Sequence, residues 1–223
     1  MSTKKINSFL SDLNADTVRE FIDKHLASLA YVLSFIIIVA FISVYFIARK
    51  NEKVKTLMVN YYKAVDSLRN DNQEEGLSLL EGIFESKYAN ADMKTISGIK
   101  IAETLNKAER KDEAVKMYKN VYEIKQNDAF LKNLSGLSAL NILINQNDST
   151  KYAEIESLIK DLSSPANPLI LLVKEQEGVF ELQRGDTEKG LKILNNVLLD
   201  KNLDEDTKNR IELIVKLYEN KDL

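Results

Sequence analysis

Few residues in this sequence could do chemistry, and none of them forms a known catalytic or metal-binding pattern. The single histidine, His25, adjoins a long apolar segment, so a Ser-His-Asp set would need an unusual topology to form around it. The acidic run at residues 204–206 favours the start of a helix rather than a metal site. Cysteine is absent, which excludes disulfides and thiolate ligands. We therefore expect no enzymatic activity, no metal and no cofactor.

Charge and motif content also narrow the range of partners. The chain carries a formal net charge of −3, and from Asn51 onward 25 Lys and Arg face 30 Asp and Glu. A basic excess that could hold a phosphate backbone is missing, which argues against nucleic-acid binding. The sequence contains neither a phosphate-binding loop nor a dinucleotide glycine pattern, so we expect no small-molecule substrate. The expected partners are proteins and membrane lipid.

The most apolar segment covers residues 26–48, which are 23 residues without a charge, glycine or proline. A helix of this length rises about 34 Å, enough to cross a hydrocarbon core of about 30 Å. A buried core helix is one alternative, but such helices seldom run so far without a polar face. A cleaved signal peptide is another, but 25 residues precede the segment and no small-x-small cleavage site follows it. The sequence thus predicts a polar tail at 1–25, a transmembrane helix at 26–48 and a soluble domain at 51–223.

The charges that flank this segment do not decide its direction through the membrane. Four basic residues precede it and four follow closely, and the second group lies nearer to the apolar residues. By the positive-inside rule, this arrangement leans slightly toward a cytoplasmic soluble domain.

The soluble part repeats a pattern of small residues. One set opens four apolar helical patterns at spacings of 38, 39 and 37: Gly76, Ala114, Ala153 and Gly190. A second set precedes it at spacings of 38, 37 and 39: Ala64, Ala102, Ala139 and Gly178. The two small residues of one unit are 12 apart in three units and 14 apart in the third. This spacing predicts two helices that approach closely and are joined by a tight turn.

Polar, turn-like sequences lie between the paired small residues at 70–72, 110–112, 145–150 and 184–186, and a final helical pattern covers 204–220. The pattern resembles the tetratricopeptide repeat, although its period is near 38 rather than 34 and the usual aromatic positions are poorly kept. The predicted fold is all-α: one transmembrane helix, then a tetratricopeptide-like solenoid of about four helical hairpins, then a capping helix. An irregular helical bundle is the alternative.

Stacked helical hairpins form a groove lined by the first helix of each unit. Taking Ala102 and Ala139 as equivalent positions predicts the residues that line a groove for a protein segment: Ile96, Ile99, Glu103, Asn106, Lys107, Leu140, Leu143 and Ile144. The alternative for Leu143 and Ile144 is that they simply pack the core.

The order of parts resembles the YfgM-like family, an ancillary subunit of the bacterial SecYEG translocon. The residues that carry the resemblance are 21–25 before the apolar segment, 61–64 at the start of the repeats, and Glu113 and Ala114 in the second unit. The resemblance implies a single-pass protein of the bacterial inner membrane with a cytoplasmic N-terminus and a periplasmic repeat domain. It also implies work with the translocon and with chaperones during protein export.

Two further hypotheses stay open at this point. One is a membrane-anchored adaptor for another envelope complex, such as cell-division or respiratory machinery, or an adaptor that faces the cytoplasm. The other is an enzyme regulator or cryptic enzyme, which a titratable cluster in a deep pocket would support.

Overall fold

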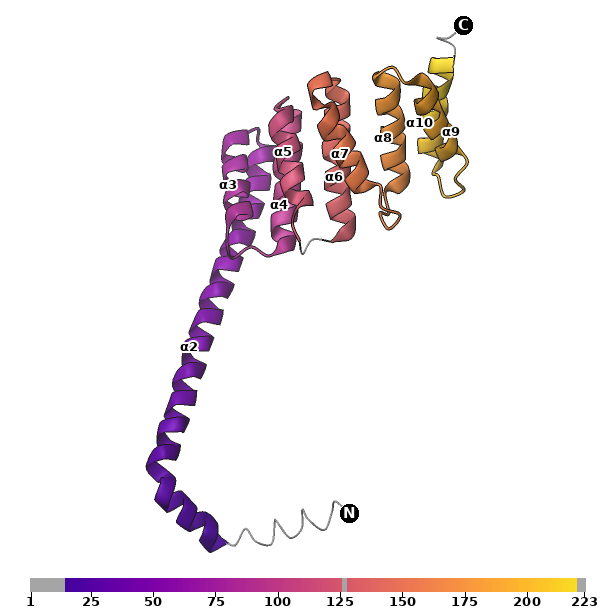
Figure 1. The fold of residues 1–223 in the computed structure, drawn as a ribbon. Helices are drawn as coiled ribbons and strands as arrows, with labels where there is room; N and C mark the ends of the chain where they lie inside the picture. The colour runs from indigo at the N-terminus through magenta and orange to yellow at the C-terminus, as the bar shows by residue number, and fades with distance from the viewer. Residues whose placement is uncertain (1–14, 126–127, 220–223) are drawn as a thin grey trace, which may run out of the picture. The chain divides into compact units, whose positions relative to one another are not determined.

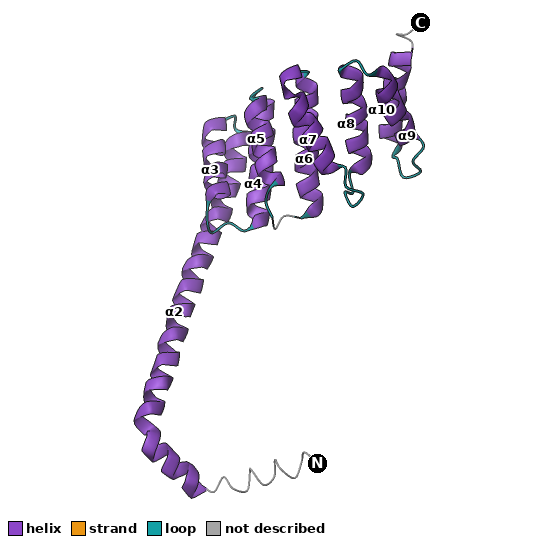
Figure 2. Cartoon of the chain, viewed as in Figure 1, coloured by secondary structure: helices purple, strands orange, loops and turns teal. Residues whose placement is uncertain are grey.

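The computed structural model describes residues 15–125 and 128–219, and all regular structure in these ranges is helical (Figure 2). The predicted all-α class is therefore confirmed. The chain divides into two compact units, residues 1–55 and 56–223. Residues 1–14 of the predicted polar tail lie outside the described residues, and residues 15–25 are helical.

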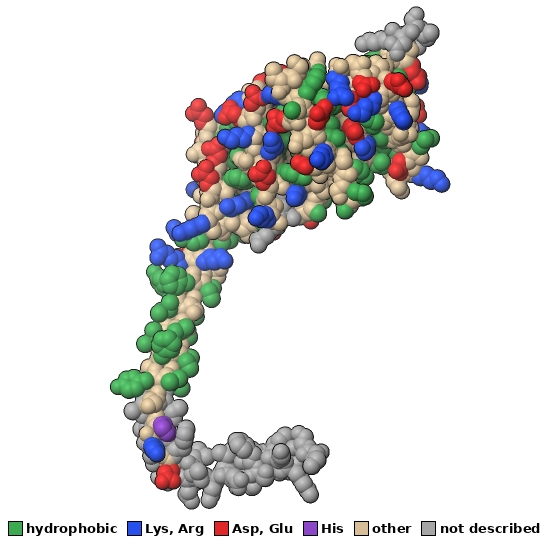
Figure 3. All heavy atoms as spheres, viewed as in Figure 1, with side chains coloured by type: hydrophobic (Ala, Val, Ile, Leu, Met, Phe, Trp, Pro, Cys, Tyr) green, Lys and Arg blue, Asp and Glu red, His purple; other side chains and the backbone are tan. Residues whose placement is uncertain are grey.

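The first unit contains most of helix α2, which runs from Ala15 to Arg69. Between Tyr31 and Ile47 its large apolar side chains are 45% to 77% exposed (Figure 3). In a core helix these side chains would be buried. Within the described residues, α2 is the one helix long and apolar enough to cross a membrane.

The second unit is a row of helical hairpins (Figure 1). After the last turns of α2, its helices are α3 (Gln73–Glu85), α4 (Ala91–Lys107), α5 (Lys111–Tyr122), α6 (Ala129–Gln146), α7 (Tyr152–Leu162), α8 (Ile170–Gln183), α9 (Thr187–Leu198) and α10 (Glu205–Glu219). Helix α2 pairs with α3, α4 with α5, α6 with α7 and α8 with α9. Helix α10 follows the last hairpin and packs against α9, as predicted for a terminal helix.

Three of the four hairpins turn in the same way. A residue with positive φ follows the first helix: Asp71 (58°), Glu109 (58°) or Gly185 (94°). The backbone N–H of the next residue then donates to the carbonyl oxygen five positions earlier, at 2.9 Å in all three turns. This pattern closes a helix end in the Schellman motif. The repeat inferred from the sequence is therefore also present in the backbone conformation of these three turns.

The paired small residues mark where the two helices of a hairpin approach most closely. A Cβ atom on Gly76 would lie 3.1 Å from the carbonyl oxygen of Ala64, and one on Gly190 would lie 2.9 Å from that of Gly178. Ala102 and Ala114, the pair in the second hairpin, are fully buried. Close helix approach at these positions is therefore confirmed.

The third hairpin departs from the pattern, and the role predicted for Ala153 is wrong. Asn147 ends α6 in the left-handed conformation, and a short 3₁₀ helix, Ser149–Lys151, comes before α7. These extra residues turn Ala153 outward to an exposed position, and Ile155 is buried instead. The longer spacing of 14 between the small residues was the sign of this difference.

The hydrophobic core of the second unit forms two clusters. The larger one extends from Leu57 to Phe180 and includes residues of α2 to α8. The smaller one contains residues of α8, α9 and α10: Leu182, Leu194, Val197, Ile211 and Val215. Helix α8 therefore contributes to both clusters.

The loop between α7 and α8 depends on the buried side chain of Asn167. Its amide nitrogen donates to the Leu162 carbonyl oxygen at 2.8 Å, and its amide oxygen accepts from the Leu169 backbone N–H at 2.9 Å. Asn167→Ala would leave one buried and one partly buried backbone group unpaired, and is expected to lower the free energy of unfolding by about 2 kcal/mol. Urea unfolding followed by circular dichroism measures this loss. The exposed Asn195→Ala serves as the control, and equal stability of the two variants would contradict the assigned role.

Candidate functional site

The first helices of the hairpins line three hollows, and we call the surface that contains them the first-helix face. The first hollow lies between α2 and α4, the second between α4, α5 and α6, and the third between α6, α8 and α10. Asn141 and Asn145 of α6 line both the second and the third hollow. The second and third hollows therefore adjoin at α6, and the first lies between α2 and the N-terminal part of α4. Together they offer an extended segment several places to bind.

The first hollow, called the apolar hollow below, has a volume of about 170 Å³. Its lining comes from one stretch of α2 and one of α4: Met58, Tyr61, Tyr62, Met93, Ile96 and Ser97. The rings of Tyr61 and Tyr62 meet edge to face, with centroids 6.3 Å apart. Methionine side chains adapt to different ligand shapes, and tyrosine offers apolar area with a polar tip.

The second hollow, of about 380 Å³, is lined mainly by polar side chains. The Asn145 amide nitrogen donates to the Asn141 amide oxygen at 2.6 Å, which orients both amides. The phenol of Tyr118 also lines this hollow, and its hydroxyl interacts with that of Ser138. Burial raises the pKa of this phenol. A neutral phenol and amide groups offer both donors and acceptors, which is what the polypeptide backbone requires.

The third hollow, of about 470 Å³, contains a buried ion pair at one wall. Glu175 of α8 is 2% exposed, and Arg210 of α10 donates to both of its carboxylate oxygens at 2.6 and 2.8 Å. These hydrogen bonds raise the pKa of the guanidinium above its usual value. Arg210 is half exposed, so it presents positive charge to the hollow while it satisfies Glu175.

The predicted groove residues of α4 lie in several environments. Ile96 lines the apolar hollow and Asn106 lines the second hollow. Ile99 is half-buried and packs against the main core. Glu103 is partly exposed and forms an ion pair with Lys100 at 3.3 Å, and Lys107 is exposed at the last position of the helix.

The prediction that three residues of α6 line the groove is wrong. Leu140, Leu143 and Ile144 are each no more than 1% exposed and belong to the main core. Helix α6 packs against α5, α7 and α8, so the positions equivalent to exposed ones on α4 are covered. The alternative that Leu143 and Ile144 pack the core is the one that the structure supports.

Sequence reasoning missed the polar side chains that α6 does present to the face. Ser138, Asn141 and Asn145 follow one another at spacings of three and four, which places them on one side of a helix that is otherwise mostly apolar. This row of polar residues on an apolar helix can be recognised in the sequence and indicates an exposed side of the helix. The contributions of Tyr61, Tyr62 and Arg210 depend on tertiary packing and had no comparable local signature.

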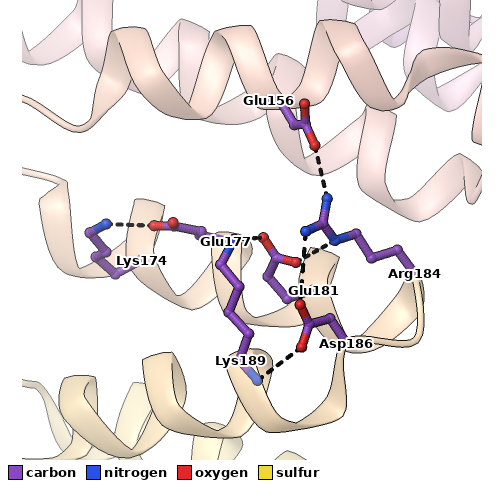
Figure 4. Close-up of polar contacts among 7 residues, drawn as sticks. All are labelled: Glu156, Lys174, Glu177, Glu181, Arg184, Asp186 and Lys189. Atoms are coloured by element: carbon purple, nitrogen blue, oxygen red, sulfur yellow. Dashed lines mark hydrogen bonds and ion pairs between the residues drawn. The ribbon is translucent and has the colours of Figure 1, made fainter.

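Helices α7, α8 and α9 also carry charged side chains that pair with one another (Figure 4). Glu181 of α8 is nearly buried and pairs with Arg184 and with Lys189, the latter at 2.6 Å. Arg184 also reaches Glu156 of α7 at 2.9 Å. These ion pairs join α7, α8 and α9, so we interpret them as structural. No group of three or more His, Cys, Asp or Glu side chains suited to a metal ion occurs in the described ranges.

A comparison of this chain with protein-family models, with curated proteins and with solved structures finds no match.

Proposed function

We propose that this protein is a membrane-anchored, non-enzymatic scaffold that binds segments of other proteins on its first-helix face. The observation that carries the proposal is the series of three hollows across α2, α4, α6, α8 and α10. The first lining is apolar and aromatic, the second is mainly polar, and the third combines aliphatic and amide side chains with one ion pair. Such a mixed surface suits a polypeptide, which presents side chains of every kind together with backbone donors and acceptors.

The apolar part of α2 supports retention at a membrane. Exposure of these apolar side chains to water is unfavourable in free energy, and insertion into lipid removes that cost. Arg49, Lys50, Lys53 and Lys55 follow directly, where basic residues can contact lipid headgroups (Figure 3). We therefore propose that residues 26–48 anchor the protein in lipid.

The partners and the placement that we propose come from the family resemblance. They are the SecYEG translocon and periplasmic chaperones, with the protein in the bacterial inner membrane, its N-terminus in the cytoplasm and the repeat domain in the periplasm. A topology reporter fused after Leu223 tests the orientation. We expect periplasmic activity, and cytoplasmic activity would overturn this part of the proposal.

Site-specific photo-crosslinking in cells tests the binding face. A photo-reactive amino acid at Asn141 lies on the first-helix face, and one at the exposed Ser78 of α3 serves as the control. We expect position 141 to crosslink translocon subunits or exported proteins in higher yield than position 78. Equal yields at both positions would contradict binding on this face, whereas strong crosslinks from position 141 to another envelope complex would favour an adaptor role.

A further inference from the structure

We infer that the apolar hollow binds one aromatic side chain of the partner segment, specifically a tyrosine or tryptophan whose O–H or N–H bonds with Ser97. This inference rests on the proposed function and specifies the chemistry of the segment. It follows from the size of the hollow, the character of its walls and an unpaired hydroxyl at its floor.

The size of the hollow matches a single ring. Its volume is about 170 Å³, and a cavity of about 150 Å³ in another protein holds one benzene molecule. The hollow lies between two helices of the second unit and opens outward, with Ile96 47% exposed and Met58 51% exposed. A side chain of a passing segment can therefore enter it without a change in the fold.

The walls favour an aromatic ring over an aliphatic chain. Tyr61 and Tyr62 meet edge to face, and a third ring can continue this arrangement. Met58 and Met93 contribute thioethers, which make favourable contacts with ring edges. A charged side chain would lose its hydration among these groups without gaining a partner.

The floor of the hollow selects a ring with a polar tip. Ser97 is 1% exposed, and among the described residues its hydroxyl oxygen has no hydrogen-bond partner. A buried hydroxyl without a partner destabilises the unliganded protein. The hydroxyl oxygen is covered by neighbouring atoms, so the Ser97 side chain must rotate toward the hollow to form a hydrogen bond with a phenol O–H or an indole N–H. A phenylalanine ring offers no such group.

Short capped peptides that differ only at a central tyrosine, tryptophan, phenylalanine or alanine provide the test. Their affinities for the full chain held in amphipol are measured by fluorescence anisotropy. We expect the tyrosine peptide to bind about three- to tenfold more tightly than the phenylalanine peptide, which is the effect of one hydrogen bond. The chain contains no tryptophan, so a blue shift in the emission of the tryptophan peptide reports burial of its ring directly.

Two variants and one control identify the site. Ser97→Ala should remove the preference for tyrosine over phenylalanine and leave the affinity for phenylalanine unchanged. Ile96→Asp should weaken all three aromatic peptides, whereas Leu213→Asp, at an exposed position on α10, should weaken none. Thermal unfolding of each variant, followed by circular dichroism, confirms that it is folded.

The outcomes separate this inference from the proposed function. If Ser97→Ala keeps the tyrosine preference, or if wild type has no such preference, the inference is overturned, and crosslinking at Asn141 still tests the scaffold. If no peptide binds although crosslinks form at Asn141, the inference fails and the scaffold stands. If neither peptides nor crosslinks are found, both proposals fail.

Discussion

Gly190→Val is expected to lower the free energy of unfolding by about 3 kcal/mol. Gly190 lies where α9 approaches α8 most closely, and a Cβ atom there would be 2.9 Å from the carbonyl oxygen of Gly178 and 2.7 Å from the side chain of Leu182. The side chain can move, but the backbone oxygen belongs to the facing helix. Adding a branched side chain would therefore separate the two helices. Urea unfolding of the full chain in detergent, followed by circular dichroism, measures the loss.

The same substitution at two glycines provides a sharper control. In α3, a Cβ atom on Gly82 would meet nothing within 4 Å. Gly82→Ala should therefore raise the free energy of unfolding by up to about 1 kcal/mol, because alanine favours helix. Gly190→Ala gains the same helix propensity but meets the backbone of α8, so it should be destabilising. Stabilisation by both substitutions would contradict the close approach of α8 and α9.

Arg210→Met is the second substitution with a large expected effect. It should lower the free energy of unfolding by about 3 kcal/mol. The methionine keeps most of the volume of the side chain but leaves the carboxylate of Glu175, which is 2% exposed, without its two hydrogen bonds. An unpaired charge at a buried position is unfavourable because the protein interior solvates a charge less well than water does. Since Arg210 itself is half exposed, we place the effect at the lower end of the range for buried ion pairs.

A double variant separates the cost of the unpaired charge from the value of the ion pair. Glu175→Met with Arg210→Met removes both charges, and it should recover most of the stability lost in Arg210→Met. Arg210→Lys keeps the positive charge but cannot donate to both carboxylate oxygens in the same way. Its free energy of unfolding should therefore lie between those of the wild type and Arg210→Met. A double variant as unstable as Arg210→Met would indicate that packing of the arginine chain, and not its charge, links α8 to α10.

Much of the fold could be predicted because it depends on local patterns. The 12-residue spacing between Ala64 and Gly76 determines where two helices cross, and the structure places both residues at the contact. Polar residues between the helices were also recognisable, as at Asp186, which caps the start of α9 by accepting a hydrogen bond from the backbone N–H of Lys189. The turn after α4 came two residues earlier than predicted, because Lys111 and Asp112 begin α5.

The face itself was harder to predict because it depends on how the hairpins stack. The periodicity of α6 correctly indicates an apolar helix, but periodicity cannot tell which apolar residues face a neighbouring hairpin. The equivalence between Ala102 and Ala139 did not carry over to Leu140 and its neighbours, because α6 packs against α5, α7 and α8. Ile96 and Asn106 each line a hollow, and both belong to α4, which forms a regular hairpin with α5.

The division of the core into two clusters implies that α9 and α10, which pack on the end of α8, form a separate cooperative unit. Their apolar contacts centre on Leu194 and Ile211 rather than on the main cluster. Local opening of this end would expose only the smaller cluster, so its backbone amides should exchange with solvent faster than those of α4 and α6. Such opening would remove the third hollow, whose wall includes Arg210, and leave the first two intact. The length of partner segment that the face can hold would then depend on the folding equilibrium at the C-terminal end.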